Sequence, residues 1–169
     1  MEKLKYKVTI KTETPFNINS GLQDDGFIDQ ITVRDINGNP YIPGSTIKGK
    51  IRDNFAMLHG EIKTKELFGY EDTYSPSKIF VDNFYLINNN YSLATRFGNR
   101  INRYRCVAAD SALFSKEVIN GTFIGEIEIK YQESFTLKEE IVLAIKMITS
   151  IGGGNSRGLG KVNIELEEV

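Results

Sequence analysis

A glycine-rich stretch at residues 151–161 is the first candidate for chemistry in this sequence. It holds five glycines and two cations, at Gly152, Gly153, Gly154, Gly158, Gly160, Arg157 and Lys161. Successive backbone amides in such a turn can form a concave anion site, and the two cations would strengthen it. The alternative is a flexible linker or the end of a helix. Because only eight residues follow Lys161, we expect a loop inside a folded unit, between a helix and a last strand.

The same stretch is not a nucleotide-binding phosphate loop. That motif runs from a strand through the turn into a helix, and it ends in G-K-[ST]. Here the predicted helix comes first, and the ending is Gly160-Lys161-Val162. We therefore do not expect ATP binding.

A second candidate anion site lies at the start of a predicted helix, where Gly44 precedes Ser45, a residue typical of an N-cap. The free amides of a helix N-terminus suit a phosphate, and Lys48, Lys50 and Arg52 add positive charge. Ser45 and Lys48 also match the S-x-x-K nucleophile motif of penicillin-binding enzymes. The S-D-N and K-T-G partners of that motif are missing, which favours the capping role.

Arginines and aromatic rings alternate between residues 96 and 105. The cations are Arg96, Arg100, Arg103 and Arg105, and the rings are Phe97 and Tyr104. Single-stranded RNA is bound by this combination, since cations contact phosphates while rings and guanidinium planes stack on bases. The alternative is a solvated basic loop.

The candidate acidic groups are loop aspartates, Asp24, Asp25, Asp29 and Asp35. A carboxylate beside a basic groove can bind Mg²⁺ together with a substrate phosphate, or assist attack by a 2′-hydroxyl. For any one of them, a turn-forming or solvated role is the alternative.

His59 is the one histidine, expected to cap a helix C-terminus, and Cys106 is the one cysteine. A zinc site and a two-histidine ribonuclease are therefore excluded.

Composition indicates a soluble globular chain of one domain, residues 1–169, in the cytoplasm, with no membrane span and no signal peptide. The net charge of −1 argues against nucleic-acid binding, but the charge distribution argues for it. Windows 36–52, 83–109 and 141–164 contain no acid and hold ten of the 21 basic residues. Local clustering of cations is what a phosphate backbone senses.

Hydrophobic periodicity predicts an α+β fold. Apolar residues alternate at 4–10, 123–131 and 162–166, an apolar run covers 79–87, and spacings of three and four predict helices at 45–60 and 136–148. Thr136 and Glu139 would form a capping box. A further helical turn is expected at 64–68, and 92–113 is an excursion without clear period. The order β-α-β-β-α-β is the ferredoxin-like or RRM-like arrangement, with inserted loops.

Three stretches together resemble the RAMP superfamily of CRISPR proteins, in particular the repeated backbone subunit of type III effector complexes. The first is residues 28–52, which includes P-G-S-x-x-K-G from Pro43 to Gly49. The second is residues 102–121, and the third is the glycine loop, with S-R-G-x-G from Ser156 to Gly160. They occur in family order and cover nearly the whole chain.

The resemblance implies an RRM-like core that stacks along a CRISPR guide RNA, with a hairpin thumb that kinks this RNA. It implies self-association, other effector subunits as partners, and complementary target RNA as substrate. By motif position Asp29 is the catalytic aspartate, with Mg²⁺ or a similar divalent cation, and cleavage would leave cyclic-phosphate ends. The remaining candidate RNA contacts are Gly44, Ser45, Lys48, Lys50, Arg52, Arg96, Arg100, Arg103, Arg105, Gly153, Gly154, Ser156, Arg157 and Lys161.

Two alternatives belong to the same superfamily. One is a scaffold subunit that binds guide RNA without cutting, and the other is a repeat-RNA processing endonuclease, whose histidine chemistry His59 alone serves poorly. All three hypotheses require the two glycine-containing helix ends, 44–50 and 152–161, to line a common groove.

Overall fold

The alternating segment at the N-terminus forms the middle of an antiparallel sheet. The structure, a computed structural model, describes residues 2–21, 28–70, 75–102, 104–131 and 137–169. Six strands form the sheet in the order β2-β4-β5-β1-β6, with β3 also paired to β5. The strands are β1 (Glu2–Thr12), β2 (Tyr41–Ile42), β3 (Ile79–Val81), β4 (Phe84–Asn102), β5 (Val107–Tyr131) and β6 (Val162–Glu168).

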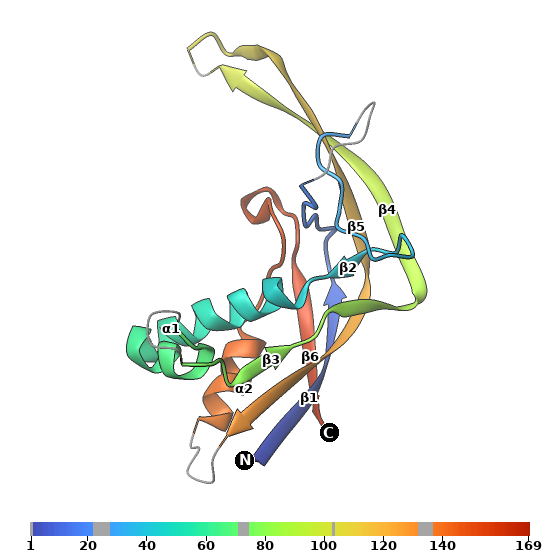
Figure 1. Cartoon of the computed structure of the whole chain (residues 1–169). Helices are drawn as coiled ribbons and strands as arrows, with labels where there is room; N and C mark the ends of the chain where they lie inside the picture. Colours follow the sequence, from blue (N-terminus) through green and yellow to red (C-terminus); the bar gives the residue numbers. More distant parts are fainter. Residues whose placement is uncertain (1, 22–27, 71–74, 103, 132–136) are drawn as a thin grey trace.

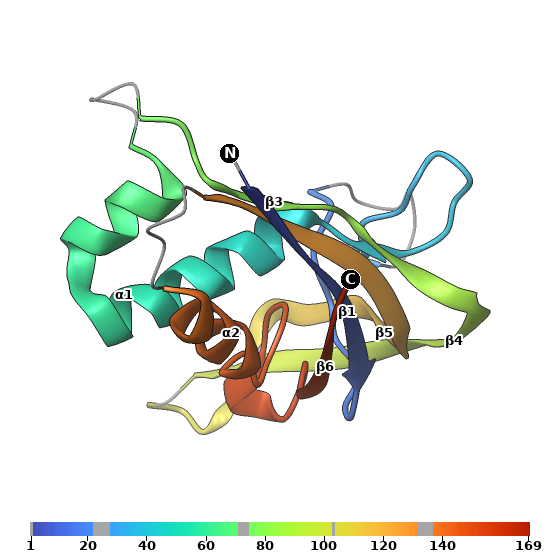
Figure 2. The same cartoon turned by 90° about the horizontal axis from the view of Figure 1, so that it is seen from below.

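The helices are α1 (Gly44–Phe68) and α2 (Lys138–Lys146), with one 3₁₀ turn at Asn155–Arg157. Both helices lie on the same side of the sheet (Figures 1 and 2). β1 lies between β5 and β6, while β5 pairs on its other side with β3 and β4. This is the ferredoxin-like order, so the predicted fold class is confirmed.

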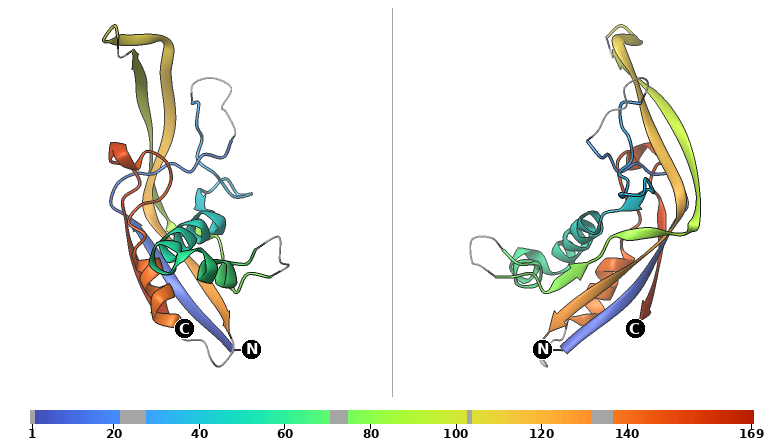
Figure 3. Two further views of the ribbon diagram at one scale, coloured as in Figure 1. Left: turned by 90° about the vertical axis from the view of Figure 1, so that its left-hand side faces the viewer. Right: turned by 45° about the vertical axis from the view of Figure 1, so that its right-hand side comes forward.

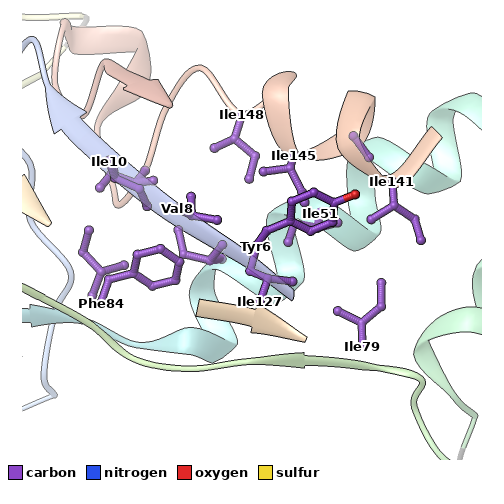
Figure 4. Packing of buried hydrophobic residues seen from close by; sticks show 14 of the residues in the cluster. Tyr6, Val8, Ile10, Ile51, Ile79, Phe84, Ile127, Ile141, Ile145 and Ile148 are labelled. Carbon is purple, nitrogen blue, oxygen red and sulfur yellow. The ribbon is translucent and has the colours of Figure 1, made fainter. Parts of the chain in front are cut away.

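Alternation along β1 explains why the sheet has one apolar face. Val8 and Ile10 are fully buried, whereas Lys5, Lys7 and Lys11, which point to the other face, are exposed. The buried residues pack against Ile51 of α1 and against Ile141 and Ile145 of α2 (Figure 4). The predicted apolar face of the second helix is thereby confirmed. Its predicted cap residue, Thr136, lies outside the described residues, and Leu137 is the N-cap.

α1 differs from the predicted helix at its start and agrees with it near residue 60. Pro43, not Ser45, is its N-cap residue, and no side chain caps the start. The capping role expected for Ser45 is therefore wrong, because the helix begins at Gly44 and Ser45 is already its second residue. α1 consists of two helical pieces that meet at Gly60, whose backbone is not helical (φ 78°). The predicted end near residue 60 and the further turn expected at 64–68 are therefore confirmed. His59 packs its ring 4.7 Å from that of Phe55, and no hydrogen bond to its buried Nε2 is found within the described part of the chain.

β4 and β5 continue beyond the sheet as a long hairpin, paired from Tyr91 with Gly121 to Asn102 with Val107 (Figures 1 and 3). This hairpin is the excursion at 92–113. The segment 92–113 lacks a two-residue apolar period because its apolar side chains are not covered: Leu93, Phe97 and Leu113 are 48%, 64% and 73% exposed. At the root of the hairpin, Ser115 to Ile119 of β5 are buried. The hairpin thumb that the family resemblance implied is present.

Candidate nucleic-acid interface

The glycine loop joins α2 to β6 and is folded against the segment that follows β1. A side chain at Gly160 would place its Cβ 2.0 Å from the carbonyl oxygen of Ile151, at a φ of +76°. The N–H of Gly153 donates to the carbonyl of Asn17 (3.1 Å), and the N–H of Gly160 donates to that of Pro15 (2.9 Å). These amides hold the loop in place and are not available to an anion. The predicted nest of open backbone amides is therefore wrong at Gly153.

The root of the hairpin meets this loop. Arg96 of β4 donates from Nη2 to the carbonyl of Arg157 in the loop (3.4 Å), and the Arg157 guanidinium lies 5.9 Å from the Phe114 ring of β5. Lys116 of β5 projects to the same place, since a Cβ added at Gly154 would lie 3.1 Å from its Nζ. We call Arg96, Lys116 and Arg157 the root cation cluster. It brings together two of the predicted cations, Arg96 and Arg157, that lie far apart in the sequence.

The pKa of Lys116 reflects the positive charges of this cluster. It is 9% exposed, and burial, followed by the charges of Arg96 and then Arg157, lowers the pKa of its ammonium group. The sequence analysis missed Lys116 because position 116 lies outside the three acid-free windows and outside the predicted elements, so nothing in the local sequence marks it.

The other predicted RNA contacts lie outside the cluster. Arg105 is exposed in the turn at the hairpin tip, and Ser156 is exposed on the 3₁₀ turn. The side chain of Arg100 and the whole of Arg103 lie outside the described residues. Lys161 forms an ion pair with Glu13 (2.6 Å), and this bond and charge raise the pKa of Lys161. An RNA phosphate would therefore compete with Glu13 for Lys161.

The start of α1 offers fewer free groups to an anion than the sequence analysis predicts. The Gly44 N–H donates to the side chain of Asn83 (2.9 Å), and Lys48 donates to Ser77 (2.8 Å). Burial, with a smaller contribution from Arg52, lowers the pKa of Lys48. Gly44 is thus not a free anion donor. Ser45 and Arg52 are exposed and Lys50 is half-buried.

The common groove between the two helix ends stays a prediction. The glycine loop leads into β6, whereas β2 leads into α1, and these two strands are the opposite edges of the sheet order. Figure 1 shows the loop and the start of α1 at the end of the sheet from which the hairpin rises. None of the described contacts joins Gly44 or Lys48 to the loop. The glycine loop pairs with the hairpin root instead.

Asp29 lies beside β5 at this root. Its Oδ2 accepts hydrogen bonds from the N–H of Ser115 (2.6 Å) and from the Ser115 hydroxyl (3.3 Å). The Asp29 N–H donates back to the Ser115 carbonyl (3.1 Å), and the backbone of Gln30 forms an isolated parallel β-bridge with Lys116. The side chain is exposed, so its carboxylate is oriented by β5 and remains accessible to solvent.

A metal ion bound by Asp29 would need further ligands from outside the described side chains. Within the described ranges there is no group of three or more His, Cys, Asp or Glu side chains able to hold an ion. Asp24 and Asp25 lie outside those ranges. Asp35 is occupied locally, since its Oδ1 accepts from the N–H groups of Asn37 and Asn39. Mg²⁺ is commonly bound by one or two carboxylates together with substrate phosphate, and Asp29 fits that arrangement as a single ligand.

A buried polar network fixes the segment that carries Asp29. Glu117, two residues after Ser115, is 6% exposed and accepts from the Thr32 N–H (3.0 Å) and from Arg34 (2.6 Å). The Glu117 N–H donates to the Gln30 carbonyl (2.9 Å). The chain from Asp29 to Arg34 is therefore held to β5 along its length. Ser115 and Glu117 were missed by the sequence analysis, because their partners are about 85 residues away.

Comparison with known proteins decides the family. The model of the RAMP superfamily matches residues 9–163. The chain belongs to the RAMP superfamily.

Individual relatives of this RAMP protein agree with the assignment. It is 27% identical over 193 residues to the CRISPR system Cms endoribonuclease Csm3 of Streptococcus thermophilus, with 96% of this chain and 87% of the relative covered. A chain of the type III-B Cmr-beta complex bound to cognate target RNA superposes with a TM-score of 0.80 at 19% identity, over 99% of this chain. Our chain spans 61% of that chain's length. A chain of apo Cmr-beta gives a TM-score of 0.75 at 13% identity, over 96% of both chains. The resemblance to type III proteins expected from the sequence is confirmed.

Neither helix in the described part of this RAMP protein is both long and apolar enough to span a membrane.

Replacing Arg34 by methionine is expected to lower the free energy of unfolding by about 2 kcal/mol. The change leaves the Glu117 carboxylate buried without its cation, and the partial exposure of Arg34 reduces the effect below that of a fully buried pair. Urea unfolding of both proteins measures it. Arg52→Met, which removes an exposed cation, is the matched control and is expected to change stability by less than about 0.5 kcal/mol. Equal effects of the two substitutions would contradict this role for the network.

Proposed function

We propose that this protein is an RNA-binding backbone subunit of a type III CRISPR effector complex, with Asp29 supporting metal-dependent cleavage of target RNA. It binds a CRISPR guide RNA, associates with copies of itself and other effector subunits along that guide, and cuts the paired strand. The observation that carries the proposal is the joint placement on β5 of Asp29, through Ser115, and of the root cation cluster, through Lys116.

The chemistry follows from this placement. Cations at the hairpin root attract the phosphate backbone, and the exposed aromatic rings at Phe97 and Tyr104, 64% and 99% exposed, are available to stack on bases. The oriented carboxylate of Asp29 assists removal of the proton from a 2′-hydroxyl, whose oxygen attacks the neighbouring phosphate. The bond from phosphorus to the 5′-oxygen breaks, which leaves a 2′,3′-cyclic phosphate on one product and, after protonation by water, a 5′-hydroxyl on the other. Mg²⁺ or a similar divalent cation, when bound, supplies charge neutralisation at that phosphate. The similarity to a protein named as an endoribonuclease supports this assignment.

The second candidate is a scaffold subunit that binds guide RNA without cutting. It is favoured by the occupation of Oδ2 of Asp29 by Ser115, and by the lack of a second metal-ligating carboxylate beside it in the described segments.

Reconstitution separates these functions. The protein, assembled with a guide RNA and its effector partners, is mixed with labelled complementary RNA in Mg²⁺ or in EDTA. We expect cleavage in Mg²⁺ but not in EDTA, and we expect the products to carry cyclic-phosphate ends. Binding without cleavage in either buffer would support the scaffold function, and failure of the purified protein to retain any RNA would overturn both. Sequencing the RNA that co-purifies with the protein identifies the guide.

A further inference from the structure

The strand β6 lies at one edge of the sheet order and pairs along its length with β1. Two hydrogen bonds fix the phase of this antiparallel ladder. The Val169 N–H donates to the Lys5 carbonyl (3.0 Å), and the Glu13 N–H donates to the Lys161 carbonyl (2.8 Å). Because alternate residues of an antiparallel strand bond the same neighbour, positions 163, 165 and 167 direct their backbone groups to β1. Positions 164, 166 and 168 direct theirs to the open edge.

The start of this open edge is already paired. The Val162 N–H donates to the Thr149 carbonyl (3.0 Å), and Ser150 forms an antiparallel bridge with Lys161. This pairing does not continue along β6, because the chain before Thr149 belongs to α2, which ends at Lys146. No other described segment pairs with the open edge of β6. Positions 164–168 therefore form a template to which an extended chain can add as a further strand.

The two faces of β6 present different side chains along this edge. Ile164 and Leu166 lie on the face that the helices cover, where they are half-buried and pack against the core. Glu165 and Glu167 are exposed on the opposite face and form no ion pair with a described residue. Lys7 is the partner of Glu167 across the ladder, but the two are not joined by an ion pair. An added strand would cover the two apolar side chains further and would face the two carboxylates.

These side chains select the incoming strand by its charge. Like charges opposite one another destabilise a strand pairing, so the β6 edges of two copies of this chain would repel through Glu165 and Glu167. A strand in which basic and apolar residues alternate would instead place cations beside these carboxylates and apolar groups beside Ile164 and Leu166. β1 has this pattern on the other side of β6, with lysines at positions 5, 7 and 11. The open edge therefore fits a basic, amphipathic strand and disfavours a second β6.

We propose that the open edge of β6 is a docking site for an extended segment of another protein, in which basic residues alternate with apolar ones. The segment adds a strand to the sheet through the backbone groups of Ile164, Leu166 and Glu168, and its cations pair with Glu165 and Glu167. This inference rests on the association with other subunits in the proposed function, for which it names a surface. It requires neither RNA binding nor cleavage by Asp29.

The first test uses a labelled peptide with the sequence of β1, E-K-L-K-Y-K-V-T-I-K-T, as the probe. Saturable binding to the full chain is expected. Leu166→Pro should weaken it by at least about tenfold, because proline removes an N–H that faces the open edge and its ring obstructs the approaching strand. The bonds to β1 come from the neighbouring positions, so this loss would also exclude simple exchange of the peptide for β1. Leu166→Val, which keeps the N–H, is the matched control and should bind as the wild type does.

A charge exchange keeps the test decisive if Leu166→Pro fails to fold. Glu165 and Glu167 are both exposed, so changing both to lysine should leave the urea midpoint nearly unchanged. The doubly substituted protein is expected to lose affinity for the lysine peptide and to gain affinity for a peptide in which every lysine is replaced by glutamate. Equal binding of both peptides by both proteins would overturn the charge selection on which the proposal depends.

Amide hydrogen exchange locates the added strand. In the isolated protein the amides of positions 164 and 166 should exchange fast and those of 165 and 167 slowly, since only the latter bond β1. We expect the peptide, and assembly with the effector partners, to slow exchange at 164 and 166. Fast exchange there in both cases would overturn the docking site, and slowing by self-association of the pure protein would assign the edge to a second copy instead. A complex that retains guide RNA while these amides stay fast would leave the proposed function intact.

Discussion

Asparagine in place of Asp29 is expected to slow target-RNA cleavage by about 10²- to 10⁴-fold, the range contributed by one acid–base group. Asparagine is nearly the same size and can still accept the hydrogen bond from the Ser115 N–H, so the segment should keep its position on β5. What is lost is the negative charge that would bind a divalent cation or assist the 2′-hydroxyl. Guide-RNA affinity is expected to be unchanged, because the root cation cluster is not altered. Single-turnover cleavage by reconstituted complexes, with parallel binding assays, measures both quantities.

Two matched variants control this experiment. Asp35→Asn removes the same charge from the same segment, at a carboxylate whose hydrogen bonds are confined to its own turn, and should cut at the wild-type rate. Ser115→Ala removes the hydroxyl, which donates to Oδ2 of Asp29 (3.3 Å) and accepts from the Asp29 N–H (3.2 Å). It keeps the shorter bond from the Ser115 N–H, so a small reduction is expected. Cleavage by Asp29→Asn at the wild-type rate in Mg²⁺ would show that the aspartate is not the catalytic group.

Alanine at Gly160 is expected to lower the free energy of unfolding by about 3 kcal/mol. The residue has a φ of +76°, which costs an L-residue about 1–2 kcal/mol. In addition, the new Cβ would meet the backbone oxygen of Ile151, and neither group can move without breaking the Ile151 N–H bond to the Gly160 carbonyl. Because the loop carries Arg157, weaker RNA binding should accompany the loss of stability. Urea unfolding and RNA titration test the two effects.

Other glycines of the same loop separate the two causes. Gly158→Ala has the same φ of +76° but nothing within 4 Å of its Cβ, so about 1–2 kcal/mol is expected from the backbone alone. Gly153→Ala has neither a positive φ nor a close neighbour and should be within about 0.5 kcal/mol of the wild type. If the three variants unfold at one urea concentration, close packing of the loop is not what requires glycine at position 160.

The core elements were predictable because burial imposes a period on the sequence. β1 alternates since one face of the sheet is covered, and Ile141, Ala144 and Ile145 recur at helical spacing since one side of α2 faces that sheet. The start of α1 and the hairpin were not predictable in this way. Pro43 caps α1 through its backbone conformation, without a side-chain bond, and the apolar residues of the outer hairpin, such as Leu93 and Leu113, are exposed, so burial imposes no period there.

The candidate site was predictable only where its residues stand out by type. Arg96, Arg157 and Asp29 were recognised from charge clusters and motifs. Lys116 was missed because its environment is created by the arrival of the glycine loop, and Ser115 because its role depends on Asp29. The Arg96–Arg157 hydrogen bond joins residues 61 positions apart, and the Ser115–Asp29 hydrogen bond joins residues 86 positions apart.

The amino-acid sequence by itself determined the order of the core strands and helices, the family, and the types of chemical group available for RNA, because these depend on local spacing and composition. The tertiary structure alone decided which groups act together. It placed Lys116 between two arginines, tied Asp29 to β5, and turned Gly44 and Lys48 toward Asn83 and Ser77. The physical reason is that the pKa, the exposure and the hydrogen-bond partners of a side chain are set by neighbours brought from distant parts of the chain.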